Sequence, residues 1–463
     1  MRVIIYLILF ALLTFGCAGT EPLYYAAPGL LPSTHREMKT AGFWISRHPY
    51  PDKVIMTPAQ VEKFNQSIRE ELKLTKDIAR MPQTVEGKSL HQELEGILKG
   101  FAGTGYYLST GRRADRKFFQ AIEKNMALER IPGQAGVQFG LVVHYADQRL
   151  LPTKEPIYQK RGDVDFDELQ NSALDVGTPV AVVQTSADGK WYYVESPLTP
   201  GWVEVEKIAL CSAEGLKDFL SRTDFVVVVN PKADIFLDEA KTQYYDYARM
   251  GAQLPMNQSV GATLVPNGRA QGPPLQEAII FPFRNEEGRL ILKTGYIDSE
   301  DIHDGYLAYT PRNIIRQAFK MLNAPYGWGG MYGEQDCSRF LQEIFATAGI
   351  NLPRNSSAQA QVGKRFAEFT VSTTDRQKLS VLSEAVGGTT ILPMKGHIML
   401  YLGMVDERPY AIHAVWAYRE KGRVAADVIR VINRVAVTDL FLGKWSKKGS
   451  LLERLLSIVD IIN

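Results

Sequence analysis

The sequence is poor in cysteine, with only Cys17, Cys211 and Cys337 among 463 residues. The three lie far apart, which excludes a disulfide framework and a zinc site built from cysteines. An excess of one charge is also missing, because 53 basic and 51 acidic residues give a formal net charge of +2. A basic surface that would indicate nucleic acid as a partner is therefore not expected. The length and the hydrophobic content of 45% indicate a globular chain of several domains.

A long apolar run occurs at the N-terminus. Within residues 1–20, Arg2 precedes a nearly uninterrupted apolar run from Val3 to Phe15, which is too short for a comfortable membrane span. This pattern predicts a cleaved export signal. Gly16 directly before Cys17 also suggests bacterial lipoprotein processing, with Cys17 as the acylated new N-terminus. The alternative is an ordinary cysteine at the edge of a signal that is removed elsewhere.

Residues 21–130 show helical patterns but no group of side chains suited to catalysis or ligand binding. A helix is predicted to begin at Thr57-Pro58, because threonine is a good N-cap and proline is tolerated at the first helical position. Further helical patterns run from Leu94 to Leu98 and from Phe118 to Met126. We interpret this range as a helical N-terminal domain that supports the domains after it.

Short strands replace the helices from residue 131 onward. In residues 131–215, Asp188-Gly189 predicts a tight hairpin turn, and the run from Asp188 to Val194 followed by Gly201-Trp202-Val203 resembles bacterial SH3-like barrels. Residues 216–310 hold a second strand-rich block, with apolar runs at Val226–Val229, Glu277–Phe283 and Leu290–Tyr296. We interpret this block as a second, diverged SH3-like barrel with an insertion around residues 238–275.

The last domain, residues 311–463, contains the stretch that carries the chemistry. Its apolar residues Phe340, Leu341, Ile344 and Phe345 recur with the spacing of an amphipathic helix. Asp336 is a good N-cap for this helix, so Cys337 falls on its first position. The positive end of the helix dipole is expected to lower the thiol pKa from about 8.5 toward neutrality. The alternative is that Cys337 is a small buried apolar residue, which is the usual fate of a free cysteine.

Two histidines follow on apolar strands. His397 begins the run Gly396 to Gly403, and His413 lies within Ala411 to Trp416. A single histidine in such a strand is more often a satisfied core residue than a catalyst. Two histidines on successive strands, after a cysteine at a helix start, form a nucleophile–base–orienter set. His397 would take the thiol proton, and His413 would hydrogen-bond the other ring nitrogen. Farther on, the leucine spacing from Leu451 to Ile462 predicts a terminal amphipathic helix.

The order of these motifs resembles the NlpC/p60 cysteine peptidases. The motifs are Tyr326-Gly327-Trp328-Gly329-Gly330, then Asp336-Cys337-Ser338, then Gly396-His397-Ile398-Met399-Leu400-Tyr401-Leu402-Gly403, and then His413. The resemblance covers roughly residues 311–440 and implies a papain-like fold that cleaves the γ-D-glutamyl–diamino-acid bond of peptidoglycan stem peptides. By position, it implies that Cys337 is the nucleophile, His397 the base and His413 the orienting residue.

The same resemblance implies a set of substrate-binding residues. Tyr326 and Trp328 lie in the glycine-rich stretch beside the nucleophile, Asp336 and Ser338 line the amino-terminal side of the substrate, and Ser356 faces the ligand. In relatives, the first barrel covers the amino-terminal end of the cleft. We therefore expect a preference for peptides with a free N-terminal L-alanine, whose ammonium group Asp336 would receive.

Together these features predict an α+β multidomain protein with a papain-like catalytic domain, preceded by two SH3-like β-barrels and a helical N-terminal segment. The expected function is an exported cell-envelope cysteine endopeptidase acting on peptidoglycan stem peptides. No metal or organic cofactor is implied, and a membrane is expected as a partner only through a lipid at Cys17. Two alternatives stay open: an inert wall-binding lipoprotein, and an amidase or acyltransferase on the same scaffold.

Overall fold

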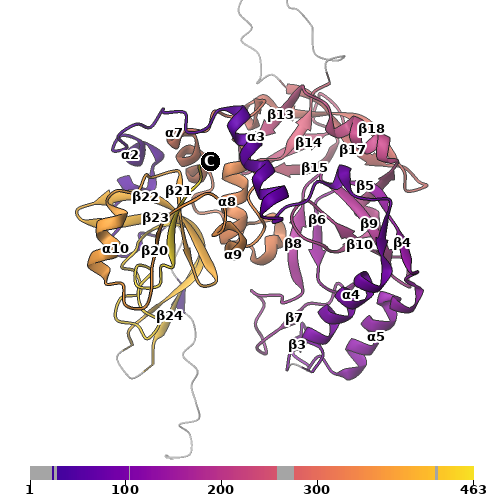
Figure 1. The fold of residues 1–463 in the computed structure, drawn as a ribbon, viewed down its shortest axis with the longest axis horizontal. Coiled ribbons are helices and arrows are strands. Elements are labelled where there is room, and N and C mark those ends of the chain that lie inside the picture. The colour runs from indigo at the N-terminus through magenta and orange to yellow at the C-terminus, as the bar shows by residue number, and fades with distance from the viewer. Residues whose placement is uncertain (1–22, 25–28, 104, 258–275, 423–425, 463) are drawn as a thin grey trace, which may run out of the picture.

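The structure is a computed structural model that describes residues 23–24, 29–103, 105–257, 276–422 and 426–462. The predicted export signal and Cys17 lie outside the described residues. Two β domains lie on one side of the molecule and the C-terminal domain on the other, and the N-terminal segment crosses between them (Figure 1). Within the described ranges, no helix has the length and apolar character that a membrane span requires.

The C-terminal domain combines a mixed sheet with helices. Its elements are β1 (Leu23–Tyr24), α7 (Pro311–Lys320), η7 (Trp328–Gly333), α8 (Cys337–Ala346), α9 (Ser356–Gln359), β20 (Lys364–Glu368), α10 (Asp375–Leu382), β21 (Thr390–Met394), β22 (His397–Val405), β23 (Arg408–Glu420), β24 (Val428–Asp439) and β25 (Ser457–Asp460). The strand order is β1-β24-β23-β22-β21-β25-β20, and all pairs are antiparallel except β1 with β24. This α+β arrangement is the predicted class.

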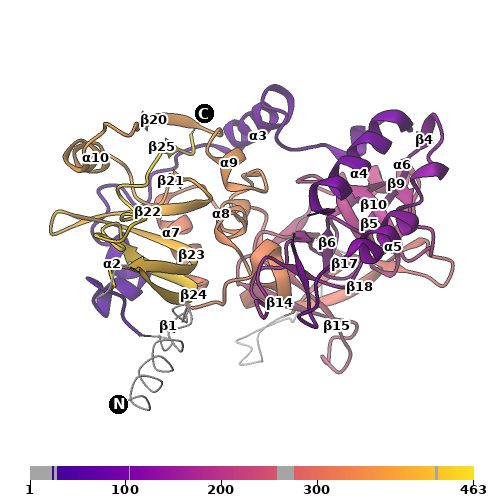
Figure 2. The ribbon, with the colours of Figure 1, turned by 90° about the horizontal axis from the view of Figure 1, so that it is seen from below.

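Helix α8 is the central element of this domain. It packs against β22 and β23, and every residue from Cys337 to Phe345 is buried. In the view from below, α8 lies on the side of the C-terminal domain that faces the β domains (Figure 2). Phe340, Leu341 and Ile344 form the apolar stripe that the sequence predicted, each with 0% exposure. Because the opposite face is covered as well, the charged residues of α8 are buried too.

The terminal amphipathic helix predicted from Leu451 to Ile462 is wrong. Residues 451–454 form turns, Leu455 forms a bridge with Met394, and β25 inserts between β20 and β21. Leu451, Leu452 and Leu455 are buried in the core on one side of the sheet. Short apolar runs are ambiguous between helix and strand, and here backbone pairing of β25 with two neighbouring strands outweighs the local helical spacing.

The first β domain contains a seven-stranded sheet in the order β12-β5-β9-β10-β11-β6-β8. Its core holds Trp191, Tyr193 and Trp202, which are at most 5% exposed, and the turn predicted at Asp188-Gly189 joins β9 to β10. The elements are β4 (Gln134–Gly136), β5 (Gln138–Val142), β6 (Ala146–Arg149), β7 (Ile157–Tyr158), β8 (Gln170–Leu174), β9 (Pro179–Thr185), β10 (Trp191–Glu195), β11 (Gly201–Glu204), η5 (Val205–Lys207), β12 (Ile208–Cys211) and α6 (Ala213–Leu220).

The second β domain is built from two smaller sheets. One has the order β16-β13-β19 and the other β15-β14-β18-β17, and both contribute to one core that includes Val226, Ile235, Ile279 and Phe281. Its elements are β13 (Phe225–Val228), β14 (Lys232–Phe236), β15 (Tyr244–Arg249), β16 (Gln253–Pro255), β17 (Gln276–Arg284), β18 (Leu290–Asp298), η6 (Ser299–Asp301) and β19 (Ile302–Asp304). The three strands predicted from the apolar runs are therefore present, and part of the predicted insertion lies outside the described residues.

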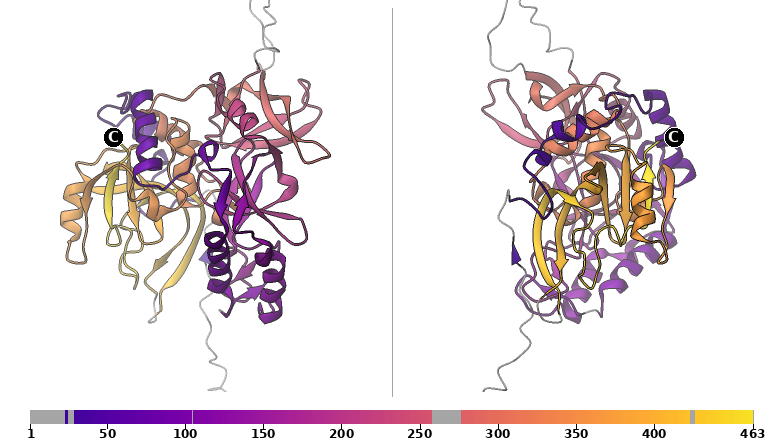
Figure 3. Two further views of the ribbon diagram at one scale, coloured as in Figure 1. Left: turned by 45° about the vertical axis from the view of Figure 1, so that its right-hand side comes forward. Right: turned by 90° about the vertical axis from the view of Figure 1, so that its left-hand side faces the viewer.

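The N-terminal segment contributes to two different cores. Trp44 and Phe64, from α2 and α3, pack in the core of the C-terminal domain, whereas Leu94 and Phe119, from α4 and α5, pack in the core of the first β domain. Seen from the side of the C-terminal domain, its sheet lies in front of the β domains (Figure 3, right). The elements are η1 (Glu37–Lys39), α2 (Ala41–Ile45), α3 (Pro58–Gln66), η2 (Ser67–Glu71), η3 (Ile78–Arg80), β2 (Thr84–Glu86), α4 (Gly87–Phe101), β3 (Tyr107–Leu108), α5 (Arg116–Met126) and η4 (Leu128–Arg130).

A buried network of charges joins the three domains behind the nucleophile helix. Asp175 of the first β domain accepts hydrogen bonds from Arg249 Nε of the second (2.8 Å) and from Arg339 of α8. Arg339 also donates to Glu343 on the next turn of α8 (2.7 Å). Burial alone would raise the pKa of Asp175, but Arg249 and Arg339 lower it to about 2. Because removing one member would leave a buried charge unpaired, this network fixes the position of α8 relative to both β domains.

Candidate active site

The nucleophile candidate lies at the first position of α8. Asp336 caps the helix, with its side chain accepting a hydrogen bond from the backbone N–H of Arg339 (2.9 Å). This places Cys337 where the sequence predicted it, with 7% exposure. The first N–H groups of a helix have no partner within the helix, so this end of α8 presents donors beside the sulfur atom.

Glycines upstream of α8 allow the first β domain to approach the site. Gly329 and Gly330 adopt positive φ angles of 61° and 88°, and a Cβ on either would lie within 3 Å of Gln170 or Ala173 of β8. Tyr145 closes the contact, because its hydroxyl donates to the carbonyl of Gly330 (2.5 Å) and accepts from Gly333 N–H (3.2 Å). The glycine-rich stretch is thus required by close packing between two domains.

The expectation that the helix dipole lowers the Cys337 pKa is wrong. Burial is the largest influence and raises the pKa of the thiol to about 12, and the negative charge of Asp336 acts in the same direction. The backbone N–H groups of Ile398 and Ser338 and the charge of Arg354 oppose this rise without reversing it. A helix N-terminus stabilises a negative charge at an exposed site by about 0.3–1 kcal/mol. This is too little to offset the cost of removing the thiolate from water.

The two histidines face each other on β22 and β23. Nε2 of His397 lies 2.6 Å from Nδ1 of His413, and Nε2 of His413 lies 2.8 Å from Oγ1 of Thr438 on β24. Ile398, the residue after His397, directs its backbone N–H to the sulfur of Cys337. Nδ1 of His397 is therefore the ring nitrogen left for the thiol, and the start of β22 lies beside the start of α8.

The protonation of this chain follows from its hydrogen bonds. If His397 is to accept a proton at Nδ1, its Nε2 must carry a hydrogen and donate to Nδ1 of His413. Nε2 of His413 then carries a hydrogen and donates to Thr438. Burial lowers the pKa of His397 to about 4, with Arg454 adding to the effect, and burial also lowers the pKa of His413. Both imidazoles are therefore neutral at pH 7.

Asp336 carries more interactions than its role as a cap requires. Its two oxygens accept hydrogen bonds from Arg354 (Nη2–Oδ2, 2.7 Å), Ser338 (Oγ–Oδ1, 3.0 Å) and the N–H of Gly329 (3.2 Å). Burial would raise the pKa of Asp336, but the adjacent Arg354 guanidinium lowers it below its usual value. The carboxylate is thus ionised and already paired with a buried cation, which the sequence did not predict.

Aromatic side chains from three elements gather beside the glycine-rich stretch. Phe166, in a loop of the first β domain, has its ring centroid 5.2 Å from Trp328, 5.0 Å from Trp416 and 6.5 Å from Tyr326. The Trp328 indole N–H also donates to the backbone carbonyl of Asp167 (3.1 Å). Tyr326 and Trp328 are thereby joined to the first β domain.

Ser356 lies at the start of α9, a short helix that is linked to the nucleophile helix through Gln359. The Gln359 amide donates to the backbone carbonyl of Ser338 (2.9 Å). The structure therefore brings His397 and His413 into direct contact, places Cys337 beside the start of β22 through Ile398, and puts Ser356 on the neighbouring helix.

Three residues of this site were missed in the sequence, for different reasons. Arg354 lies two positions before Ser356, but its partner Asp336 is 18 positions away and the pairing has no local signal. Thr438 directly follows the apolar run Val435–Val437 near the end of β24, a signal that could have identified it. Phe166 lies in an acidic loop without periodicity, so nothing in its surroundings indicates a contact with Trp328.

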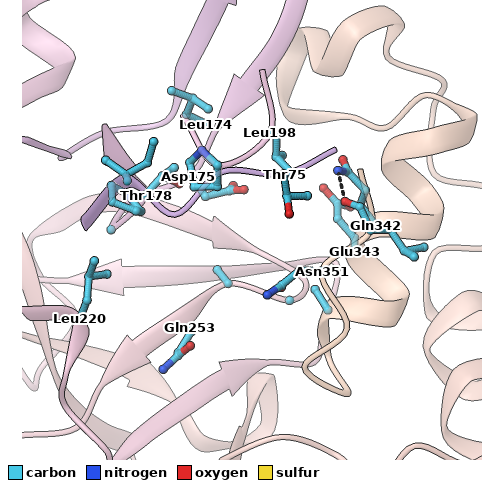
Figure 4. A pocket seen from close by; sticks show the side chains of 18 of the residues that line it. Thr75, Leu174, Asp175, Thr178, Leu198, Leu220, Gln253, Gln342, Glu343 and Asn351 are labelled. Atoms are coloured by element: carbon cyan, nitrogen blue, oxygen red, sulfur yellow. Dashed lines mark hydrogen bonds between the residues drawn. The ribbon is translucent and has the colours of Figure 1, made fainter. Parts of the chain in front are cut away.

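A cavity of about 540 Å³ lies behind α8, between the N-terminal segment, both β domains and the C-terminal domain. Gln342 and Glu343 of α8 face it from one side, and Asp175 and Gln253 come from the two β domains (Figure 4). Its lining includes neither Cys337 nor His397. The cavity is therefore separate from the catalytic candidates Cys337 and His397. Among the described residues, no group of three or more His, Cys, Asp or Glu side chains could hold a metal ion.

Two family models match the chain. The model of SH3 domains of the SH3b1 type matches residues 156–204, within the first β domain, and the model of the NlpC/P60 family matches residues 323–414. The second match spans Cys337, His397 and His413. The second SH3-like barrel predicted for residues 216–310 stays a prediction.

Among known proteins, the chain is similar to two proteins of Bacillus subtilis (strain 168). It is 40% identical over 57 residues to the bifunctional muramidase/DL-endopeptidase CwlT and 41% identical over 56 residues to a gamma-D-glutamyl-L-lysine dipeptidyl-peptidase. Each match covers 12% of this chain, and the matches cover 17% and 19% of these relatives.

A solved structure of an NlpC/P60 endopeptidase from Photobacterium damselae subsp. piscicida matches far more of the chain. The match covers 91% of this chain and 96% of that one, with a TM-score of 0.72 and 21% identity. This likeness shows that the two chains share the fold. Residues 323–414 therefore belong to an NlpC/P60 family domain, which an SH3 domain of the SH3b1 type precedes in the same chain.

Proposed function

We propose that the protein is a cysteine endopeptidase that hydrolyses the γ-D-glutamyl–diaminopimelate bond of peptidoglycan stem peptides. The observation that carries this proposal is the hydrogen-bonded chain His397–His413–Thr438, which begins beside the sulfur of Cys337. It lies inside the NlpC/P60 domain, and one relative is named a gamma-D-glutamyl-L-lysine dipeptidyl-peptidase. Nucleophile, base and orienter are the parts that acyl transfer by a cysteine requires.

In the first step, Cys337 Sγ attacks the γ-carbonyl carbon of D-glutamate while Nδ1 of His397 takes the thiol proton. The negative charge that develops on the carbonyl oxygen is held by backbone N–H groups at the start of α8. His397 then gives its proton to the leaving amine of the diamino acid. A water molecule, deprotonated by His397, hydrolyses the resulting thioester and frees the thiol.

Before substrate is attacked, Cys337 and His397 are both neutral, and this decides when the proton is transferred. With the pKa of Cys337 raised to about 12 and that of His397 lowered to about 4, the thiol holds its proton until attack begins. Proton transfer therefore accompanies formation of the carbon–sulfur bond. His413 stabilises the imidazolium that forms on His397, because its Nδ1 accepts the Nε2 hydrogen of His397.

The substrate's amino-terminal part is proposed to lie between α8 and the first β domain. Tyr326 and Trp328, which the contact with Phe166 orients, would line this side together with Ser338 and Ser356. Asp336 would receive the ammonium group of a free N-terminal L-alanine. Since Arg354 already neutralises part of the Asp336 charge, we expect this preference to be weaker than an unpaired carboxylate would give.

Export and lipid attachment belong to the same proposal. An NlpC/P60 domain and an SH3 domain next to each other suit a protein that acts on the cell wall, and the N-terminal apolar run before Cys17 would supply its export. Metabolic labelling with a fatty acid tests the anchor: the wild-type chain should take up label, and Cys17→Ala should not. Label in the Cys17→Ala chain would refute the assignment.

Incubation of purified protein with the tripeptide L-Ala-γ-D-Glu-meso-diaminopimelate, followed by mass spectrometry, tests the reaction. The expected products are L-Ala-D-Glu and free diaminopimelate. Cys337→Ala and His397→Ala should remove nearly all turnover, because proton transfer by a positioned group contributes about 10²- to 10⁴-fold. Cys211→Ser is the matched control and should leave turnover near normal. Cleavage at another bond, or full turnover by Cys337→Ala, would refute the proposal.

A comparison of the free and N-acetylated tripeptide tests the amino-terminal preference. The free peptide should have the higher kcat/KM, because a blocked amine gives Asp336 no cation to bind. Asp336→Asn should reduce the difference, although it also alters the helix cap. Equal kcat/KM values for the two peptides would refute the preference while leaving the reaction itself in place.

A further inference from the structure

The turn of residues 443–450 presents a tryptophan and three lysines to solvent at one end of the C-terminal sheet. Trp445 is 74% exposed and has a φ of 73°, a left-handed conformation that is uncommon for a bulky side chain. Lys444, Lys447 and Lys448 are exposed around it, and Lys444 Nζ lies 5.0 Å from the centroid of the Trp445 ring. The fold therefore holds this indole outside the core, among positive charges.

This turn is fastened to the end of the β23–β24 hairpin. The backbone N–H of Lys447 donates to both carboxylate oxygens of Asp427, just before β24 (2.9 and 3.1 Å). A Cβ on Gly443 would lie 3.3 Å from the carbonyl oxygen of Arg419, near the end of β23. Lys421 directly follows β23 and is exposed as well. The turn and the hairpin end therefore form one face, called here the Trp445 surface, which consists of Lys421, Lys444, Trp445, Lys447 and Lys448.

Carboxylates do not neutralise the lysines of the Trp445 surface. Within the ranges that the structure describes, none of these lysines takes part in a salt bridge, and the lysines that do are others. Two acidic residues beside the turn hold its backbone instead: Asp427 accepts from the N–H of Lys447, and Glu453 accepts from that of Ser450 (2.5 Å). In a chain whose formal net charge is only +2, this surface is a local concentration of positive charge.

A second group of exposed cations lies around β3 and β7. These two strands pair, and the loop after β3 brings Arg112 and Arg113 toward Arg161, since a Cβ on Gly111 would lie 3.3 Å from Nε of Arg161. All three arginines are exposed. The β23–β24 hairpin and the β3–β7 pair reach the lower end of the molecule on either side (Figure 1; Figure 3, left). One flat anionic surface can therefore meet both groups of cations.

The N-terminal chain enters the sheet from the same end. β1 pairs in parallel with β24, Leu23 with Arg430, so β1 begins at the end of the sheet where β24 begins. At no more than about 3.6 Å a residue, the chain between Cys17 and Leu23 spans at most about 20 Å. A lipid on Cys17 would therefore be held near the Trp445 surface.

Resting on the lipid attachment proposed for Cys17, we infer that the Trp445 surface docks on the anionic phospholipid headgroups of the membrane. Lysines close to an anionic bilayer are attracted to its headgroups, and an indole favours the boundary between headgroups and acyl chains. An anionic wall polymer would match the lysines but offers no apolar layer to Trp445. An acyl chain together with a basic patch is also a pair of signals that gives stable attachment to a membrane.

Docking at this surface fixes the orientation of the catalytic candidates. β22 begins at His397, and Leu400 of β22 pairs with Ile412 of β23. Arg419 near the end of β23 therefore lies beyond the start of β22, at the same end of the sheet. The end of the C-terminal domain that carries His397 is thereby turned toward the membrane.

Co-sedimentation with vesicles tests this docking in a chain that begins at residue 18, which contains every described residue and has no Cys17 to acylate. This chain should bind vesicles of equimolar phosphatidylcholine and phosphatidylglycerol far better than vesicles of phosphatidylcholine alone. Lys444→Gln/Lys447→Gln/Lys448→Gln should lower the partition coefficient on the anionic vesicles about 100-fold. Brominated acyl chains in these vesicles should quench the fluorescence of Trp445, and Trp445→Phe should remove that quenching.

Lys63→Gln/Lys73→Gln/Lys217→Gln is the matched control, because it removes the same charge from exposed lysines of α3, the loop after η2 and α6. It should bind both kinds of vesicle as the wild-type chain does. Thermal unfolding shows whether the triple variants keep the fold. If the variant of the Trp445 surface is destabilised, the quenching measured with Trp445→Phe decides instead.

Equal binding of the wild-type chain to the two kinds of vesicle would overturn the inference, and so would undiminished binding by the variant of the Trp445 surface. Binding to isolated, membrane-free cell wall without binding to either vesicle would assign the surface to a wall polymer and would also overturn it. The outcome is independent of the lipid anchor and of hydrolysis. If Cys17 takes up no fatty acid, the anchor fails, whereas vesicle binding by the chain from residue 18 would still support docking.

Discussion

Alkylation of Cys337 by iodoacetamide is expected to be slow at pH 7 and to rise about tenfold with each pH unit up to pH 9. The thiolate is the reacting species, and burial raises the pKa of this thiol to about 12 from its ordinary value of 9.0. At pH 8 or below, the thiolate fraction is then lower by about a thousandfold than for an ordinary thiol.

The expected difference in rate is smaller than the difference in thiolate fraction. A thiolate of higher pKa is intrinsically more nucleophilic, and with a Brønsted coefficient of about 0.4–0.5 this recovers a factor of about 15–30. Folded protein should therefore be labelled at Cys337 about 30- to 60-fold more slowly than protein unfolded in urea, before any steric protection is counted. Mass spectrometry of the peptide that contains Cys337 measures both rates separately from the labelling of Cys211.

A thiolate–imidazolium pair would behave differently and would refute this reasoning. Its labelling rate would reach a plateau above about pH 6, where His397 in the folded protein would still be protonated by its thiolate partner. His397→Asn distinguishes the two states as well. In the neutral pair this substitution leaves the slope of rate against pH unchanged, whereas in an ion pair it removes the plateau.

Five further outcomes are expected. The acid limb of kcat/KM should lie near pH 4, because solvent protonates His397 only below about that pH and a protonated imidazole cannot take the thiol proton. The lowered pKa of His397 should reduce the free energy of unfolding in urea by about 3 kcal/mol as pH falls from 6.5 to about 4, since the unfolded chain binds the proton first. His397→Asn should remove this contribution and leave the separate loss that follows from the lowered pKa of His413. Thr438→Val should lower kcat by about tenfold by leaving the His413 N–H unpaired, and Thr438→Ser should retain it. Arg354→Met should destabilise the domain by about 3–5 kcal/mol in thermal unfolding, because Asp336 stays buried without its partner. Phe166→Ala should raise KM with little effect on kcat, because the ring contacts of Phe166 are with the proposed binding residues Tyr326 and Trp328 and with Trp416, none of which is a catalytic candidate.

Local patterns in the sequence were sufficient to predict the helix and the strands that carry the catalytic candidates. The N-cap Asp336 and the apolar stripe from Phe340 to Phe345 define α8 without reference to the rest of the chain. The apolar runs around His397 and His413 define two neighbouring strands, and neighbouring strands in sequence usually pair. The juxtaposition of the two imidazoles follows from that pairing, which is why the order of motifs was informative.

Properties that depend on contacts between several domains could not be predicted from these local sequence patterns. The pKa of Cys337 was expected to fall because only the helix terminus was visible in the sequence, whereas burial of the thiol decides the direction of the shift. The terminal leucines were expected to form a helix because the vacant position between β20 and β21 cannot be read from their spacing. Arg354 and Thr438 became functional candidates only when their partners were located.

The β domains influence the chemistry through the position of one helix. Asp175 of the first β domain and Arg249 of the second both interact with the charged residues on α8, and Gln170 and Ala173 of β8 lie against Gly329 and Gly330 just before it. Cys337 is thereby fixed from behind by buried charges and from the side by close packing. Since a displacement of about 1 Å at a reacting atom can cost about a hundredfold in rate, substitutions at Asp175 should reduce kcat although this residue touches no reacting group. The SH3 domain in this chain is therefore part of what holds Cys337, the proposed nucleophile, in place, in addition to any binding role of its own.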